Sequence, residues 1–218
     1  MRFAKPFPHD FRKPKNAKMT LGKKLKAIVK RIRKAGIKDE EIALGFLDES
    51  GVQNKANTVR VWSFGKLNIF KNTTKFHINT IGFYAIQGES CQDFLEKANG
   101  TNVNSFFNKV REANAKYKAV IVVLDNAPSH IAGTARQGCE EAGIYLLYLP
   151  PYSPDLNPIE FLWKSAKRFF SLIFPRDVQD MRKQISRVWK NLCENLGFAS
   201  SWIRSFLNPS AHSFGFRV

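Results

Sequence analysis

The chain has 218 residues, of which 44% are apolar, and its 35 Lys or Arg against 18 Asp or Glu give a formal net charge of +17. This length and apolar content predict one main domain with some appended structure. No apolar run is long enough to span a bilayer, the N-terminus is too charged for a signal peptide, and three solitary cysteines predict a reducing compartment and no zinc site, so we expect a soluble cytoplasmic protein.

The positive charge is concentrated at the N-terminus. Residues 1–38 hold 14 Lys or Arg and a single Asp, a net charge of +13. Residues 1–16 contain prolines and are expected to be extended, whereas apolar residues at helical spacing predict a helix over about 20–35. The basic face of that helix suits DNA phosphates, and it equally suits a solvated helix docked on a domain. Residues 1–40 are thus interpreted as a basic, linker-like arm and helix, whose expected DNA contacts are Lys30, Arg31, Arg33 and Lys34.

Alternating strand and helix signals follow along the chain. Strands are predicted near 42–47, 58–64, 75–86, 119–124 and 144–149, with a helix near 102–116 and further helices after 158. Residues 58–64 and 75–86 are expected to pair as a hairpin. Two apolar runs end in a carboxylate, Asp48 after the first and Asp125 after the fourth. Ligands bind at such strand ends in open α/β sheets.

A proline-rich run, residues 149–158, precedes the last of these features. Its prolines predict an exit from a strand, after which Asn157 caps a helix, Pro158 occupies the first helical position and Glu160 falls in the first turn. A capping box and an i,i+4 pair with Lys164 offer a purely structural explanation for Glu160. The apolar face of the predicted helix comprises Ile159, Leu162, Trp163, Ala166, Phe169 and Phe170, and the opposite face carries Glu160, Lys164, Lys167 and Arg168.

Together, Asp48, Asp125 and Glu160 form a candidate site of hard oxygen ligands, which suits Mg²⁺. Asn126 and His130 follow Asp125 closely and are candidates to contact the metal ligands rather than the metal itself, although turn chemistry and helix capping explain them as well. Asp155 is interpreted as a turn residue. The tail after residue 176 is expected to form amphipathic helices with Met181, Ile185, Val188, Trp189 and Leu192 facing the core.

Three ordered motifs give the chain a family resemblance. They are Asp48-Glu49-Ser50-Gly51, Asp125-Asn126-Ala127-x-x-His130 and Leu149-Pro150-Pro151-Tyr152-Ser153-Pro154-x-Leu156-Asn157-Pro158-x-Glu160-x-x-Trp163, with 34 residues between Asp125 and Glu160. Over about residues 42–170 the chain resembles the catalytic domain of insertion-sequence transposases of the DDE superfamily, in the mariner-related group. Trp62-x-x-Gly65 also fits that family's second strand.

The resemblance implies an α/β fold, a ribonuclease-H-like mixed five-stranded sheet flanked by helices. Residues 41–175 would form the catalytic domain, and residues 176–218 a helical extension packed on it. The catalytic and metal-binding residues would be Asp48, Asp125 and Glu160, with Asp48 bridging two Mg²⁺ ions and Mn²⁺ as a possible substitute. Lys164, Lys167 and Arg168 would follow the DNA backbone.

The same resemblance implies DNA strand cleavage followed by strand transfer into a TA target, within a homodimer associated with the chromosome. Transposases of this type carry helix-turn-helix modules before the catalytic domain, and the residues before position 40 are too few for them. Recognition of element ends is therefore expected from another polypeptide or frame. Two alternatives stay open: a catalytically silent or domesticated DNA-binding relic, and another nuclease with the ribonuclease-H-like fold.

Overall fold

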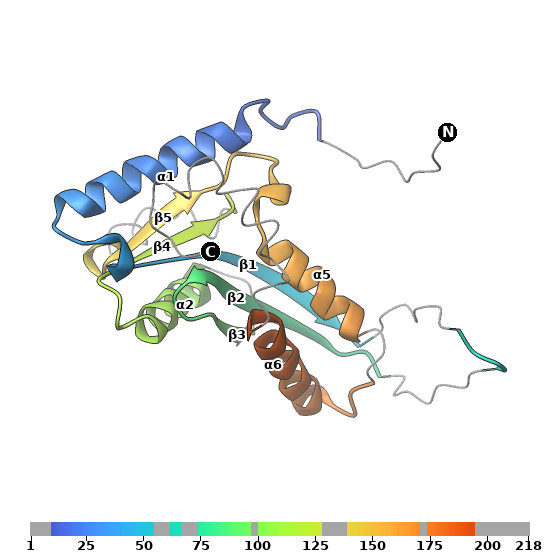
Figure 1. Cartoon of the computed structure of the whole chain (residues 1–218). Helices are drawn as coiled ribbons and strands as arrows, with labels where there is room; N and C mark the ends of the chain where they lie inside the picture. The colour runs from blue at the N-terminus through green and yellow to red at the C-terminus, as the bar shows by residue number, and fades with distance from the viewer. Residues whose placement is uncertain are drawn as a thin grey trace.

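The computed structural model describes residues 10–54, 62–66, 74–96, 100–127, 139–170 and 174–194 (Figure 1). The strands are β1 (Ile42–Gln53), β2 (His77–Gln87), β3 (Cys91–Leu95), β4 (Ala119–Leu124) and β5 (Ile144–Tyr148). The helices are α1 (Ala17–Lys34), α2 (Gly100–Ala113), α5 (Ile159–Phe170) and α6 (Val178–Glu194), with 3-10 turns at Asp39–Glu41 and Pro154–Leu156. None of the helices in these ranges is long and apolar enough to cross a membrane.

The five strands form one mixed sheet in the order β3-β2-β1-β4-β5. The first three pair antiparallel, whereas β1, β4 and β5 run parallel. The continuous β-branched run of β4 is buried at all six positions, as expected for an interior parallel strand. The predicted mixed five-stranded sheet flanked by helices is therefore confirmed.

Two strand predictions need correction. Residues 62–66 are not in a strand, so the predicted hairpin of 58–64 with 75–86 is wrong there, while residues 58–61 lie outside the described residues. β2 instead pairs with β1, from Leu44 opposite Gln87 to Gln53 opposite His77. Because β2 supplies this ladder, β1 continues through Glu49 to Gln53, whereas the predicted strand ended near residue 47. The edge strand β3 was not predicted.

Helices cover both faces of the sheet. α1, α5 and α6 share one apolar core with one face, and α2 shares a second core with the other (Figure 1). β4 shows the alternation clearly, since Ile121 and Val123 enter the first core and Val120 and Val122 the second. The first core is therefore closed by helices from distant parts of the chain, and among the named helices the second is covered by α2.

Three helices on the first face keep the apolar stripes that their spacing predicts. In α1, Leu21, Leu25, Val29 and Ile32 are buried, and the five core residues predicted in α6 are all buried. In α5 the prediction fails at Phe169, which is 52% exposed. The buried stripe of α5 ends on Phe170, and Phe169 lies about 100° around the helix from it.

Candidate active site

Neighbouring parallel strands bring Asp48 and Asp125 together. The last registered pair between β1 and β4 is Phe46 with Val123, and each aspartate lies two residues beyond its member of that pair. Side chains two residues apart on a strand share a face, so Asp48 projects toward the layer that contains α5. Contrary to expectation, Asp48 lies within its strand, opposite Gly82 of β2.

The loop after β5 carries the chain from the sheet to α5. The Leu149 amide donates a 2.8 Å hydrogen bond to the Leu124 carbonyl, and Asn126 Nδ2 donates a 2.7 Å bond to the Leu149 carbonyl. Asn126 thus ties the Asp125 end of β4 to the start of this loop. His130 lies outside the described residues.

The start of α5 differs from its predicted cap. The helix begins at Ile159, and the Asn157 backbone carbonyl accepts a 3.2 Å bond from the Glu160 amide. The Asn157 side chain is buried, and its Oδ1 atom has no hydrogen-bond partner within the described part of the chain. The expected side-chain cap is therefore absent there, and Glu160 remains exposed in the first turn of α5.

A glycine allows α5 to approach the sheet beside Asp48. A Cβ atom on Gly82 would lie 2.3 Å from the Trp189 ring and 3.0 Å from the Trp163 ring. The two tryptophans, from α6 and α5, contact each other with ring centroids 4.9 Å apart. Because Trp163 follows Glu160 by one helical turn, this close packing also helps to set the position of Glu160.

The three carboxylates open into one cleft of about 400 Å³. One side of the cleft is the strand ends, and the other is the proline-rich loop and the beginning of α5. The lining residues are Asp48, Asp125, Asn126, Leu149, Pro150, Pro151, Tyr152, Ser153, Pro154, Asn157 and Glu160.

Burial and like charges raise the pKa values of two of these carboxyl groups. Burial, followed by the negative charge of Glu160, raises the pKa of Asp48 to about 7, and Asp125 adds a smaller effect in the same direction. Although the Glu160 side chain reaches solvent, partial desolvation at the cleft wall also raises its pKa, while the positive charge of Lys167 opposes this and Asp125 adds to it. The cleft therefore concentrates negative charge that a proton or a cation would relieve.

The donor set fits a divalent cation, because carboxylate oxygens are the ligands that Mg²⁺ and Mn²⁺ accept. Within the described residues, however, no three His, Cys, Asp or Glu side chains stand close enough to hold a metal ion as they are oriented. Bringing Asp48, Asp125 and Glu160 onto one ion therefore requires side-chain movement into the open cleft.

Basic residues predicted to contact DNA lie on two helices. Lys164, Lys167 and Arg168 are exposed on α5, beyond the Glu160 turn. On α1, Lys30 and Lys34 are exposed. Two further basic residues of α1 form ion pairs, Arg31 with Glu140 at 3.1 Å and Arg33 with Asp39 at 2.5 Å.

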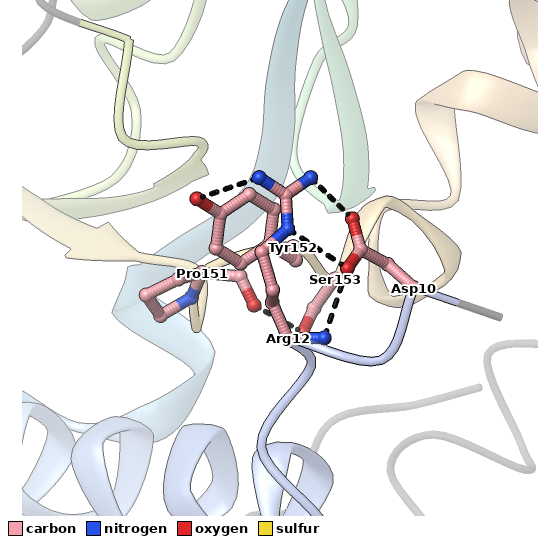
Figure 2. Close-up of polar contacts among 5 residues, drawn as sticks. All are labelled: Asp10, Arg12, Pro151, Tyr152 and Ser153. Carbon is pink, nitrogen blue, oxygen red and sulfur yellow. Dashed lines mark hydrogen bonds and ion pairs between the residues drawn. The ribbon is translucent and has the colours of Figure 1, made fainter.

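Sequence reasoning missed a contribution from the segment before α1. Arg12 lies against Tyr152 of the proline-rich loop (Figure 2). Lys13 pairs with Asp155 in the same loop. These partners are 140 and 142 positions apart. No local sequence signal connects residues so far apart.

Comparison with known families places this geometry in context. Residues 43–182 match the family described as DDE superfamily endonuclease. The chain is 35% identical over 66 residues to the Tc1 transposase of Caenorhabditis elegans. The matched region covers 30% of this chain and 24% of that protein. It is 31% identical over 68 residues to the Tcb1 transposase of Caenorhabditis briggsae, covering 31% and 25%. The matches thus span about a quarter of the length of these curated relatives.

Solved structures share the fold at low sequence identity. The mariner Mos1 paired-end complex with Mg gives a TM-score of 0.58 at 16% identity, covering 94% of this chain and 66% of the Mos1 chain. The catalytic domain of Mos1 transposase gives a TM-score of 0.53 at 18% identity, covering 86% and 93%. The ribonuclease-H-like fold implied by the sequence resemblance is therefore confirmed.

Proposed function

Because the chain belongs to the DDE superfamily of endonucleases, we propose that it is a transposase catalytic domain that performs metal-dependent DNA strand cleavage and strand transfer. The observation that carries this proposal is the convergence of Asp48, Asp125 and Glu160 on one cleft from β1, the end of β4 and the start of α5. All three residues lie within residues 43–182, the part of the chain that matches the family.

In this proposal Asp48, Asp125 and Glu160 would together hold two Mg²⁺ ions, for which Mn²⁺ could substitute. When bound, divalent cations supply Lewis-acid activation of the attacking oxygen and stabilisation of the leaving oxygen. In the first reaction water attacks a phosphodiester and releases a 3′-hydroxyl. In the second, that hydroxyl attacks a phosphodiester of target DNA, so one P–O bond forms as another breaks.

The chain's own residues would also position the DNA. The exposed cations Lys164, Lys167 and Arg168 continue from the Glu160 turn along α5, where they would contact phosphates of the substrate backbone beside the reacting bond. Lys30, Arg31, Arg33 and Lys34 on the basic face of α1 would form a second basic region at the other end of the sheet, where Arg31 lies over Tyr145 at the start of β5 and Arg33 pairs with Asp39 before β1. The neighbouring ion pairs of Arg31 and Arg33 would have to open or be shared for these two to contribute fully.

The proposal includes two partners besides DNA. Two element ends must be brought together for transposition, which favours a homodimer, and Mos1 has been solved in a paired-end complex with a transposon end. Recognition of specific element ends would come from a helix-turn-helix module on another polypeptide or frame. Association with the chromosome follows from the DNA substrate.

Cleavage of a labelled supercoiled plasmid, with and without Mg²⁺ or Mn²⁺, tests the activity. The wild type is expected to nick DNA only with metal, and Asp125→Asn and Glu160→Gln are expected to abolish nicking while DNA binding is retained. A chain that binds DNA tightly but cuts none under any metal condition would refute autonomous catalysis and would support either a missing recognition module or a DNA-binding relic.

A further inference from the structure

The segment that precedes α1 contacts the loop that forms one wall of the cleft. The guanidinium carbon of Arg12 lies 3.9 Å from the centroid of the Tyr152 ring, and Arg12 Nη1 donates a 3.3 Å hydrogen bond to the Tyr152 hydroxyl. Figure 2 shows the guanidinium against the ring, with Pro151 and Ser153 on either side of Tyr152 in the loop. A cation stacked on an aromatic face is attracted by the ring quadrupole.

Asp10 holds the Arg12 side chain in this orientation. Arg12 Nε and Nη2 donate to the two carboxylate oxygens of Asp10 at 3.0 and 2.7 Å, and the Arg12 backbone amide donates to Asp10 at 2.9 Å. These bonds lower the pKa of Asp10. Since its charge is already matched by Asp10, Arg12 is better suited to stacking on Tyr152 than to contacting a phosphate.

A second contact fixes the same loop a few residues further on. Lys13 Nζ lies 2.5 Å from Asp155 Oδ2, in the 3-10 turn Pro154–Leu156. The segment at residues 10–13 therefore touches the loop at both Tyr152 and Asp155. The second of these points is only five residues before Glu160.

The loop conformation needs such support. Tyr152 has a backbone φ of 54°, in the left-handed region that disfavours residues with a Cβ atom, and it is the only non-glycine residue with positive φ in the described part of the chain. A strained backbone of this kind persists where its surroundings hold it in place. Tyr152 also lines the cleft that contains Glu160, so a change in its conformation would alter the site directly.

We propose that Arg12 is a positioning residue for the reaction: the contacts of Arg12 and Lys13 with Tyr152 and Asp155 hold the loop, and through it the Glu160 turn, in place for DNA cleavage. The inference rests on the proposed function, to which it adds a part for the segment preceding α1. It treats residues 10–13 as part of the catalytic unit.

Hydrogen exchange tests the contact without any need for activity. The Leu156 and Asn157 amides donate 3.0 and 2.9 Å hydrogen bonds within the loop turn, to Ser153 and Pro154, and they report on its opening. Arg12→Ala and Arg12→Lys are expected to speed their exchange about tenfold, which corresponds to 1.4 kcal/mol of lost protection. Lysine keeps the charge but lacks the planar fork that pairs with Asp10 and stacks on the ring.

Two further variants control this experiment. Lys13→Ala removes the second contact and is expected to speed exchange at the same amides. Lys15→Ala removes an equal charge from an exposed position in the same segment and is expected to leave exchange unchanged. Equal exchange in the wild type, Arg12→Ala and Lys13→Ala would overturn the proposal.

Plasmid-nicking kinetics then separate positioning from DNA binding. Arg12→Ala and Arg12→Lys are both expected to lower kcat about tenfold and to change KM less than twofold, with Lys15→Ala equal to the wild type. Full rescue by Arg12→Lys, or a change confined to KM, would show that only the charge of Arg12 matters and would overturn the positioning role. Should the wild type cut no DNA, autonomous catalysis by this chain is refuted, and the exchange data still decide whether the contact holds the loop.

Discussion

Because the pKa of Asp48 is raised, we expect that replacing this residue of the candidate site stabilises the metal-free protein. Asp48→Asn keeps nearly the same shape but cannot ionise. In the folded chain the pKa of Asp48 is about 7, compared with an ordinary value of 3.8, because the group is buried and lies near Glu160 and Asp125. Folding therefore favours the protonated form of this residue.

The sign of the pH effect follows from linkage. Below about pH 4 Asp48 is protonated in both the folded and the unfolded chain, and its contribution to stability is fully present. Between about pH 4 and 7 the unfolded chain loses the proton first, so the free energy of unfolding falls by up to about 1.4 kcal/mol per pH unit. Over this window the loss amounts to about 4 kcal/mol, and solvent screening by the open cleft reduces it to about 2–4 kcal/mol.

Urea denaturation of the wild type and Asp48→Asn, in chelator at pH 4.5, 6 and 8, measures the difference. The free energy of unfolding of the variant, relative to that of the wild type, is expected to rise by about 2–4 kcal/mol between the lowest and the highest pH. The matched control is Asp93→Asn on β3, whose carboxylate is half exposed and pairs with Lys109. The control should differ from the wild type by less than about 1 kcal/mol at pH 6 and 8. A stability difference for Asp48→Asn that does not change with pH would refute the reasoning.

A bound cation should reduce the stability advantage of Asp48→Asn over the wild type. Adding Mg²⁺ at pH 8 is expected to stabilise the wild type by mass action, by about 2.7 kcal/mol at a concentration 100-fold above the dissociation constant. Asp48→Asn should gain much less, since it has lost a ligand and the repulsion that the cation relieves. Equal stabilisation of the two proteins by Mg²⁺ would show that cations bind elsewhere.

Three further predictions follow from the packing and the charged surface. Gly82→Ala is expected to destabilise the fold by about 1–3 kcal/mol in urea denaturation, because its Cβ would meet the Trp rings beneath α5 and α6, whereas Gly65→Ala, which meets nothing within 4 Å, should be near neutral. Leu21→Ala is expected to cost about 2–5 kcal/mol by the same assay because α1 is part of the core, and a loss below 1 kcal/mol would show that α1 is not firmly docked. The double change Lys164→Ala with Arg168→Ala is expected to lower the slope of log affinity against log salt by about 2 in DNA titrations, and an unchanged slope would place the phosphates elsewhere.

Some elements could be predicted from the sequence because their signal is local. The β-branched run of β4 and the apolar stripes of α1 and α6 carry their own burial pattern, and the structure reproduces them. β1 was predicted too short because Glu49-Ser50-Gly51 has the composition of a turn, and only pairing with β2 extends the strand to Gln53. β3 has no apolar alternation, and as an edge strand it depends on β2 for its existence.

The candidate site likewise contains residues that the sequence reveals and supporting contacts that it does not. The carboxylates could be found because each stands at a recognisable break in the sequence pattern, after an apolar run or a proline-rich turn. The support around them could not be found in the same way, because it comes from distant partners. Two contacts of this kind join residues far apart in the chain. They are the packing of Gly82 beneath Trp163 and Trp189 and the stacking of Arg12 against Tyr152.

The three carboxylates differ in how strongly the surrounding structure restricts their movement, and this difference suggests how the site assembles. Asp48 belongs to a strand paired on both sides and covered by α5, whereas Asp125 and Glu160 are exposed at the ends of their elements. Glu160 lies in the first turn of α5, directly after the loop that contains the strained residue Tyr152, so we expect it to be the most adjustable of the three. Mutual repulsion opposes convergence in the metal-free chain, and a bound cation removes that repulsion. Convergence of the site is therefore expected to accompany cation binding, with the contacts on Tyr152 limiting how far Glu160 can move away.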